Sequence, residues 1–252
     1  MDDLRAVLVC VDFADLLAVT LPYNRHHFKQ VLVVTTPLDR ETLKVAKRHQ
    51  AEVYVTNAFY DHAAAFNKWV GLEEALDSFG RVGWLCLMDV DILWPQEIVP
   101  FECAIGSLYT PYRHIFSDVT RPIPAEHEWS LYPIHPGVDE FSGYSQIFHA
   151  QDSVLGPAPW HELDWVHAGG ADSFFQAKWS PNRKIRPPFE VLHLGEPGAN
   201  WCGRVTPYLI GGEPVEASWR LAQVKSYLAG RERAFHCYAH EKLGSLAVKE
   251  ET

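Results

Sequence analysis

Residues 84–93 read WLCLMDVDIL, an apolar stretch that carries two acids. Its leading apolar residues have the length and composition of a buried strand, and two acids, Asp89 and Asp91, stand near its end. Because side chains alternate along a strand, we expect both carboxylates on one face while Val90 points into the core. The stretch therefore predicts a strand over 84–93 that presents a pair of acids.

Three further apolar runs of strand length precede this stretch, at residues 4–11, 31–35 and 51–56. The segments between them predict helices at residues 13–21, 40–49 and 63–79. The strands are apolar throughout rather than alternating, which is typical of a parallel sheet covered by helices on both faces. We predict an α/β fold with a mostly parallel sheet and a Rossmann-like N-terminal half.

The chain changes character after Pro95, because most of its 17 prolines lie between residues 95 and 214. Proline favours loops over regular elements, so this part is expected to be rich in shaped loops. The elements predicted here are strands over 103–108, 144–149 and 190–194, a short helix over 172–179 and a C-terminal helix over 216–240. We interpret residues 1–252 as one domain, with an N-terminal half over 1–94, a loop-rich half over 95–214 and a helical segment over 215–252.

Composition narrows the class of protein. The 252 residues carry a formal net charge of −10, which disfavours binding to nucleic acid or anionic membrane over the whole surface. No apolar run approaches the roughly 20 residues of a membrane span, and the N-terminus lacks the plan of a signal peptide. The cysteines are scattered without a CxxC pair, which fits a reducing compartment. We expect a soluble protein of the cytoplasm with no membrane partner and an undetermined oligomeric state.

The pair of acids points to a metal. Two carboxylates about 7 Å apart at the end of an apolar strand repel each other and need a partner in a low dielectric. A divalent cation resolves both problems, and oxygen-rich sites suit Mg²⁺ or Mn²⁺. Ligands also bind at the carboxyl ends of the strands in open α/β sheets. The alternative is a strand that enters a solvated loop with both acids at the surface.

An ordered set of motifs carries a family resemblance. The DVD of residues 89–91 resembles the DxD motif of GT-A-fold glycosyltransferases. Further stretches resemble family-2-like members of that fold in the same order: FNKWVG at 66–71, GYSQIF at 143–148, GGADSFF at 169–175, VLHLG at 191–195 and NWCGR at 200–204. The resemblance spans residues 4–205 and extends to bacteriophage enzymes of this general fold that glycosylate modified pyrimidines in DNA.

The resemblance implies an activity. It implies metal-dependent transfer of a sugar from a nucleotide-diphospho-sugar, with a UDP-sugar expected first, to an acceptor hydroxyl, and we expect inversion at the sugar. Mn²⁺ or Mg²⁺ would neutralise the leaving diphosphate. The acceptor would be a glycan, a small molecule or a hydroxymethylated pyrimidine in DNA, and a viral enzyme would act in the host cytoplasm. Residues 1–94 would bind the donor, and residues 95–214 would hold the acceptor and complete the metal site.

The resemblance also assigns roles to the acids. Asp89 and Asp91 would hold the metal, and His193 would complete its shell, although a lone histidine on a strand is also compatible with a satisfied core residue. Asp172 is the candidate general base that takes the proton of the acceptor hydroxyl. It is equally suited to cap a helix, and the acidic pair usual in the family is replaced here by Ala171-Asp172, which leaves inversion against retention open.

Donor contacts are implied at seven positions. Lys68 and Arg204 suit the diphosphate, the latter as a bidentate donor, although an exposed helix lysine is an even alternative for Lys68. Asp12 and Asp39 follow strands and suit the base or ribose, but both also suit helix starts. The full set of predicted donor-binding residues is Asp12, Thr35, Asp39, Lys68, Asp89, Asn200 and Arg204.

Other features admit weaker interpretations. The basic stretch PNRKIRPP at 181–188 is a solvated loop or a phosphate contact, and HELDWVH at 161–167 is a poor match to a zinc site. The aromatic residues Trp129, Tyr132, Tyr144, Trp160 and Trp165 either stack on a sugar or pack loops. A sugar-phosphate nucleotidyltransferase is the alternative enzyme, but the VDFA at 11–14 lacks its glycine-rich basic loop. A non-catalytic nucleotide- or glycan-binding module is the alternative outside enzymes.

Overall fold

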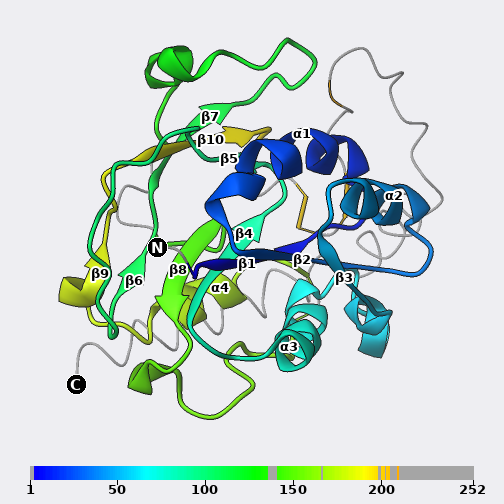
Figure 1. Ribbon diagram of the computed structural model, residues 1–252. Coiled ribbons are helices and arrows are strands. Elements are labelled where there is room, and N and C mark those ends of the chain that lie inside the picture. The colour runs from blue at the N-terminus through cyan, green and yellow to red at the C-terminus, as the bar shows by residue number, and fades with distance from the viewer. Residues whose placement is uncertain are drawn as a thin grey trace, which may run out of the picture.

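The computed structural model describes residues 3–135, 141–165, 167–197, 200, 201, 203, 204 and 209 (Figure 1). The strands are β1 (Arg5–Val9), β2 (Gln30–Thr35), β3 (Glu52–Val55), β4 (Trp84–Asp89), β5 (Ile92–Leu93), β6 (Leu108–Tyr109), β7 (Tyr112–Phe116), β8 (Ser145–His149), β9 (Lys184–Ile185) and β10 (Glu190–Leu194). The α-helices are α1 (Ala14–Asn24), α2 (Arg40–Arg48), α3 (Lys68–Phe79) and α4 (Ala171–Gln176). Short 3₁₀ helices are η1 (Arg25–His27), η2 (Ala58–Ala63), η3 (Glu126–Leu131), η4 (Ser153–Leu155) and η5 (Pro181–Arg183).

The strands form two sheets. The larger has the order β3-β2-β1-β4-β8-β6-β9, and the smaller has the order β5-β10-β7. Strands β1 to β4 pair in parallel, whereas β8 runs antiparallel to β4 and β6. The predicted α/β fold with a mostly parallel sheet is therefore confirmed. The predicted division into one domain over 1–252 stays a prediction, because the segment 215–252 lies outside the described residues.

Helices cover both faces of the larger sheet, and alternation along the strands explains why (Figure 1). Ala6 and Leu8 of β1 pack in one cluster with residues of α1 and α2, and Val7 packs in a second cluster with residues of α3 and α4. Both faces of β1 are thus apolar, as the unbroken run of apolar residues predicts. Strand β3 is the exception, because it forms the edge of the sheet and its side chains are largely exposed.

The stretch 84–93 is not one strand, and this corrects the prediction. Strand β4 ends at Asp89, Val90 and Asp91 form a turn, and β5 then joins the smaller sheet. The Asp89 N–H donates to the Tyr144 carbonyl at 3.0 Å, whereas the Asp91 carbonyl accepts from the Leu194 N–H at 2.8 Å. The two acids therefore stand at the crossing between the sheets, and not on one face of a continuous strand.

Two other boundaries differ from prediction for local reasons. Helix α3 begins at Lys68 rather than at residue 63, because the Asn67 side chain accepts from the Trp69 N–H at 3.2 Å and caps the helix. The strand predicted over 103–108 is reduced to β6, and β7 was not predicted because polar and apolar side chains mix within it. The predictions over 144–149, 172–179 and 190–194 correspond to β8, α4 and β10.

The C-terminal helix predicted over 216–240 lies outside the described residues. Within the part of the chain that the structure describes, none of the helices combines the length and the hydrophobicity needed to span a bilayer.

Candidate active site

A cavity of about 590 Å³ opens where the two sheets meet. Its walls come from the carboxyl ends of β1 and β4, the starts of α3 and α4, and the strands β7 and β10. Six residues predicted from the sequence line it together: Lys68, Asp89, Asp91, Asp172, His193 and Asn200. The position agrees with the rule that open α/β sheets bind ligands at the carboxyl ends of their strands.

Asp91 and His193 face each other across the crossing of the sheets. His193 Nδ1 lies 3.0 Å from the Gly195 carbonyl oxygen and so donates its proton there, which leaves a lone pair on Nε2. That Nε2 lies 3.7 Å from Asp91 Oδ2, and Asp91 Oδ1 is buried without a hydrogen-bond partner among the described residues. Two acceptor atoms that face each other need a proton or a cation between them.

The electrostatics of Asp91 support the same interpretation. Burial raises the pKa of Asp91, the neighbouring Asp89 carboxylate adds to the rise, and His193 and Arg113 offset only part of it. A carboxylate in this environment gains from any bound cation. The fit to Mg²⁺ or Mn²⁺ therefore rests on an orphaned carboxylate oxygen beside an imidazole lone pair.

The protein supplies only part of a metal shell. No three His, Cys, Asp or Glu side chains among the described residues are grouped to hold a metal ion by themselves. Mg²⁺ commonly takes one or two carboxylates from a protein and completes its shell with substrate phosphates and water. Asp91 and His193 match that kind of partial site, which would be completed by a diphosphate.

Lys68 lies within the group of acids. Its Nζ is 2.9 Å from Asp89 Oδ1, and its side chain is 14% exposed. Burial lowers the pKa of Lys68, but the carboxylates of Asp89, Asp172 and Asp91 outweigh that effect and raise it. The alternative of an exposed helix lysine is therefore wrong, and the cavity holds a positive charge at the first residue of α3.

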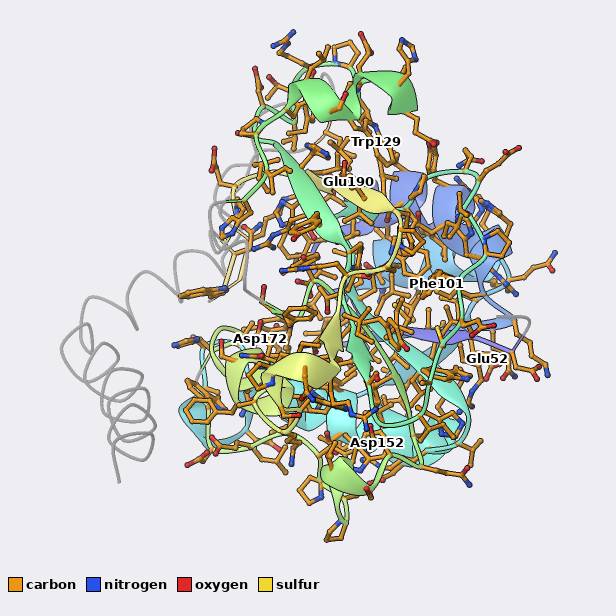
Figure 2. All side chains as sticks on the ribbon, turned by 90° about the vertical axis from the view of Figure 1, so that its left-hand side faces the viewer. Glu52, Phe101, Trp129, Asp152, Asp172 and Glu190 are labelled. Carbon is orange, nitrogen blue, oxygen red and sulfur yellow. The ribbon has the colours of Figure 1, made fainter. Side chains whose placement is uncertain are left out.

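Asp172 is held by main-chain donors. Its Oδ2 accepts from the Gly143 N–H at 2.7 Å, and its Oδ1 accepts from the Ser173 N–H at 3.0 Å. The alternative of a helix cap is corrected, because Gly170 with φ of 100° occupies the cap position and Asp172 lies in the first turn of α4 (Figure 2). A carboxylate fixed this way at a cavity wall can accept a proton from a bound hydroxyl.

Four predicted donor-binding residues do not line the cavity. Asp39 caps α2 with Oδ1 to the Thr42 N–H at 3.1 Å and holds the β1–α1 turn with Oδ2 to the Asp12 N–H at 2.7 Å. Arg204 donates from Nη1 and Nη2 to the two oxygens of Asp15 at 2.5 and 2.8 Å. Thr35 is fully buried at the end of β2. Donor binding by Asp12, Thr35, Asp39 and Arg204 stays a prediction.

The sequence did not reveal the opposite wall of the cavity. Arg113 of β7 is 9% exposed and its guanidinium lies 4.1 Å from the centre of the Tyr144 ring. Burial lowers the pKa of His135, and Arg113 and His193 lower it further. The sequence around Arg113, between Tyr112 and His114, has no hydrophobic periodicity that would distinguish a residue of the site from one on the surface.

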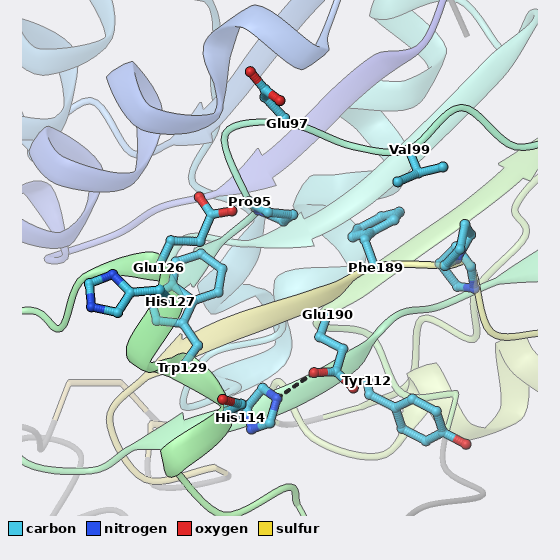
Figure 3. A pocket seen from close by; sticks show the side chains of 13 residues that line it. Pro95, Glu97, Val99, Tyr112, His114, Glu126, His127, Trp129, Phe189 and Glu190 are labelled. Atoms are coloured by element: carbon cyan, nitrogen blue, oxygen red, sulfur yellow. Dashed lines mark hydrogen bonds and ion pairs between the residues drawn. The ribbon is translucent and has the colours of Figure 1, made fainter.

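The smaller sheet also lines a second cavity of about 570 Å³ on its other side (Figure 3). Because side chains alternate along a strand, Tyr112 and His114 of β7 face this second cavity while Arg113 faces the first. Glu190 of β10 reaches His114 with 2.6 Å between Oε2 and Nε2, and His193, which lies three residues further along the same strand, faces the first cavity. Strands β7 and β10 are thus a single-layer wall between two cavities.

His161 belongs to the core beneath the site, and the described residues of the stretch that begins with it form no zinc centre. His161 Nδ1 lies 2.5 Å from Glu73 Oε1, and the imidazole is stacked between the rings of Trp69 and Phe175. Trp69 follows Lys68 on α3, and Phe175 lies one turn after Asp172 on α4. This histidine therefore joins the two helices that carry cavity residues.

The structure also places the aromatic residues that were considered for sugar stacking. Of the five aromatic residues considered for sugar stacking, only Tyr144 lines the first cavity, and Trp129, Trp160 and Trp165 are buried in the core.

In the basic loop, Arg186 Nη1 donates to the Thr110 and Pro111 carbonyls at 3.1 and 3.2 Å, and its guanidinium lies 4.2 Å from the centre of the Phe141 ring. Arg186 thus ties loops together.

Comparison with known proteins gives distant matches. No protein-family model matches the chain, and no curated protein matches its sequence. A glucosyl-3-phosphoglycerate synthase from Mycobacterium tuberculosis, solved with Mn²⁺, UDP-glucose and phosphoglyceric acid, is 13% identical with a TM-score of 0.47, over 91% of this chain and 79% of that one. A mannosyl-3-phosphoglycerate synthase from Rubrobacter xylanophilus is 15% identical with a TM-score of 0.45, over 91% and 73%. Identities this low do not assign a substrate.

Proposed function

We propose that the chain is a metal-dependent glycosyltransferase that moves a sugar from a nucleotide-diphospho-sugar, a UDP-sugar first, to an acceptor hydroxyl. The observation that carries the proposal is the pair of Asp91 and His193, whose acceptor atoms face each other beside a buried oxygen that has no partner among the described residues. Such a pair could hold a cation, and that cation would then share the cavity with Lys68.

The charges of the cavity suit a leaving diphosphate. Mn²⁺ or Mg²⁺ held by Asp91 and His193 would neutralise charge on the diphosphate oxygens. Lys68 Nζ, now bonded to Asp89, is a donor that can move to a phosphate oxygen, because its four-carbon stem is flexible. Asp89 would then be released toward the metal, directly or through water.

Asp172 provides the base in this proposal. Its two main-chain hydrogen bonds fix the carboxylate while one lone pair on each oxygen stays available to an acceptor hydroxyl. The proton would pass from the hydroxyl to Asp172, the acceptor oxygen would form a bond to the sugar carbon, and the bond from that carbon to the diphosphate oxygen would break. We expect inversion, because a single displacement by the activated hydroxyl would bring the attacking oxygen to the face of the sugar opposite the leaving oxygen.

Thermal-shift measurements test the proposal. UDP and GDP should each be tried with and without Mn²⁺, and a nucleotide that stabilises the protein only with metal supports the transferase. The Asp91→Asn variant should lose that metal-dependent stabilisation, whereas Asp118→Asn, a matched change at an exposed loop residue, should keep it. Indifference of the wild-type protein to every nucleotide, with or without metal, would reject the proposed function.

A further inference from the structure

Trp201 is placed unlike the other tryptophans. It is 52% exposed and lines the first cavity, whereas the remaining tryptophans among the described residues are buried or half-buried. An aromatic ring that stays half in water at a cavity edge offers apolar surface that a ligand can cover with a gain in free energy.

The indole is fixed in place from behind. Its ring lies within 5° of parallel to the His167 ring, with 5.7 Å between centres, and a Cβ on Gly169 would come within 2.4 Å of it. The Trp201 carbonyl accepts from the Ala168 N–H at 2.9 Å. Burial lowers the pKa of His167 to about 4, so this imidazole is neutral at physiological pH and supports the indole without adding charge.

The position of Trp201 is on the side of the cavity that carries Asp172. Gly169, against which the indole packs, lies next to Gly170, the cap of α4, and Asp172 is in the first turn of that helix. Gly169, Gly170, Asp172 and Trp201 all line the same cavity. A ligand that lies on the indole is therefore close to the carboxylate assigned as base, which is where an acceptor belongs.

We propose that Trp201 is the platform on which a pyranose ring of the acceptor stacks, so that the acceptor of this chain is a glycan; this inference rests on the proposed function. The C–H edges of a pyranose carry partial positive charge and suit the negative face of an indole. Four carboxylates line the cavity, at Asp89, Asp91, Asp172 and Glu196, and they disfavour a nucleic-acid strand as the partner. An acyclic hydroxy acid would leave the indole uncovered.

Tryptophan fluorescence reads this contact directly. Protein saturated with UDP and Mn²⁺ should be titrated with methyl glycosides of glucose, galactose and mannose, with glycerate, and with a hydroxymethylated oligonucleotide. At least one glycoside should change the emission, and Trp201→Phe should abolish most of that change while Trp84→Phe, a matched change at the far end of β4, should not.

Affinity then separates the platform from a structural role. Trp201→Leu should weaken glycoside binding about tenfold, Trp201→Phe should retain most of it, and Gly169→Ala should weaken it by displacing the indole. The UDP-dependent thermal shift should be unchanged in all three variants. An equal loss of UDP binding in Trp201→Leu, or a response to glycerate or to the oligonucleotide alone, would overturn the inference. Absence of any UDP and Mn²⁺ shift in the wild-type protein would instead count against the proposed function.

Discussion

His161 Nδ1 and Glu73 Oε1 lie 2.5 Å apart in a layer where neither side chain reaches solvent. Glu73 also accepts from the main-chain N–H groups of Trp160 and His161 and from Arg81 Nη2. Burial alone would raise the pKa of Glu73. His161, Arg81 and the Trp160 N–H together outweigh burial and lower the pKa. This carboxylate is therefore the charged centre that holds α3 against the loop in front of α4.

Removing the charge of Glu73 should destabilise the fold. Glu73→Gln leaves Arg81 and the His161 ring with a weaker partner in a buried site, so we expect a loss of about 3 kcal/mol in the free energy of unfolding. Urea unfolding at neutral pH measures this loss. The control is Glu74→Gln, which changes the next residue, whose carboxylate accepts a hydrogen bond from the Thr56 hydroxyl. Equal stability of the two variants would contradict the role of the buried pair.

Stability should fall in mild acid because of His161. Burial lowers the pKa of His161 from its ordinary value of 6.5, and Glu73 offsets only part of that shift. Below about pH 6.5 the unfolded chain binds a proton at this histidine while the folded chain does not, so the free energy of unfolding decreases as pH falls. His27, His135 and His167 shift in the same direction and add to the slope.

The contribution of His161 to that slope can be isolated. His161→Phe keeps a ring between Trp69 and Phe175 but has no group to titrate, so its stability should change less between pH 7.5 and pH 5.5 than that of the wild-type protein. Urea unfolding at the two pH values gives both slopes. Identical slopes would show that His161 does not take part.

Lys68 should compete with the metal. Lys68→Met removes the ammonium next to Asp89 and leaves the carboxylates of Asp89 and Asp91 without that positive charge, so Mn²⁺ should stabilise the variant more than the wild-type protein. Transfer should nevertheless be slower, because the variant lacks the proposed phosphate donor. Thermal shifts over a series of Mn²⁺ concentrations measure the first effect, and Lys68→Arg is the charge-preserving control. A weaker response to Mn²⁺ in Lys68→Met would contradict the competition.

The base should be separable from binding. Asp172→Asn removes the proton acceptor and keeps one of the two main-chain hydrogen bonds, because the amide has a single oxygen to accept from the N–H groups of Gly143 and Ser173, so kcat should fall at least about 100-fold. The UDP- and Mn²⁺-dependent thermal shift should remain. Loss of that shift together with activity would mean that Asp172 serves donor binding instead.

The geometry of the base can be tested without changing it. A Cβ on Gly143 would lie 2.9 Å from Asp172 Cβ, so Gly143→Ala should displace the carboxylate and lower kcat while the KM for the donor stays unchanged. The control is Ala168→Gly, a milder change at the same wall of the cavity. Gly156→Ala would not serve as a control, because Gly156 has a positive φ. Wild-type kcat in Gly143→Ala would contradict a fixed carboxylate.

Much of the N-terminal half could be predicted from the sequence because its strands are apolar throughout. The exceptions have local causes. Asn67 starts α3 by capping it, and the turn at Val90 and Asp91 divides what reads as one apolar strand between two sheets. Neither effect changes the apolar pattern, so neither is visible in it.

Only part of the candidate site could be predicted from the sequence, because some of its contacts join residues that lie far apart along the chain. Asp89 and Asp91 are predicted from the apolar strand before them and His193 from the ordered motifs, and the structure brings all three to one cavity. Arg113 and the platform at Trp201 were missed, because their roles depend on neighbours from distant segments. Tyr144 beneath Arg113 and Gly169 beneath the indole are contacts that no local pattern encodes.

The crossing at residues 90 and 91 has a further consequence for dynamics. The two sheets share continuous chain there, and the hydrogen bond from the Leu194 N–H to the Asp91 carbonyl extends the pairing of β5 with β10, in which Ile92 lies opposite His193. Any opening that separates β5 from β10 at this point also separates Asp91 from His193. Affinity for a ligand that bridges them and protection of the Leu194 amide against hydrogen exchange are therefore linked, and each should rise with the other.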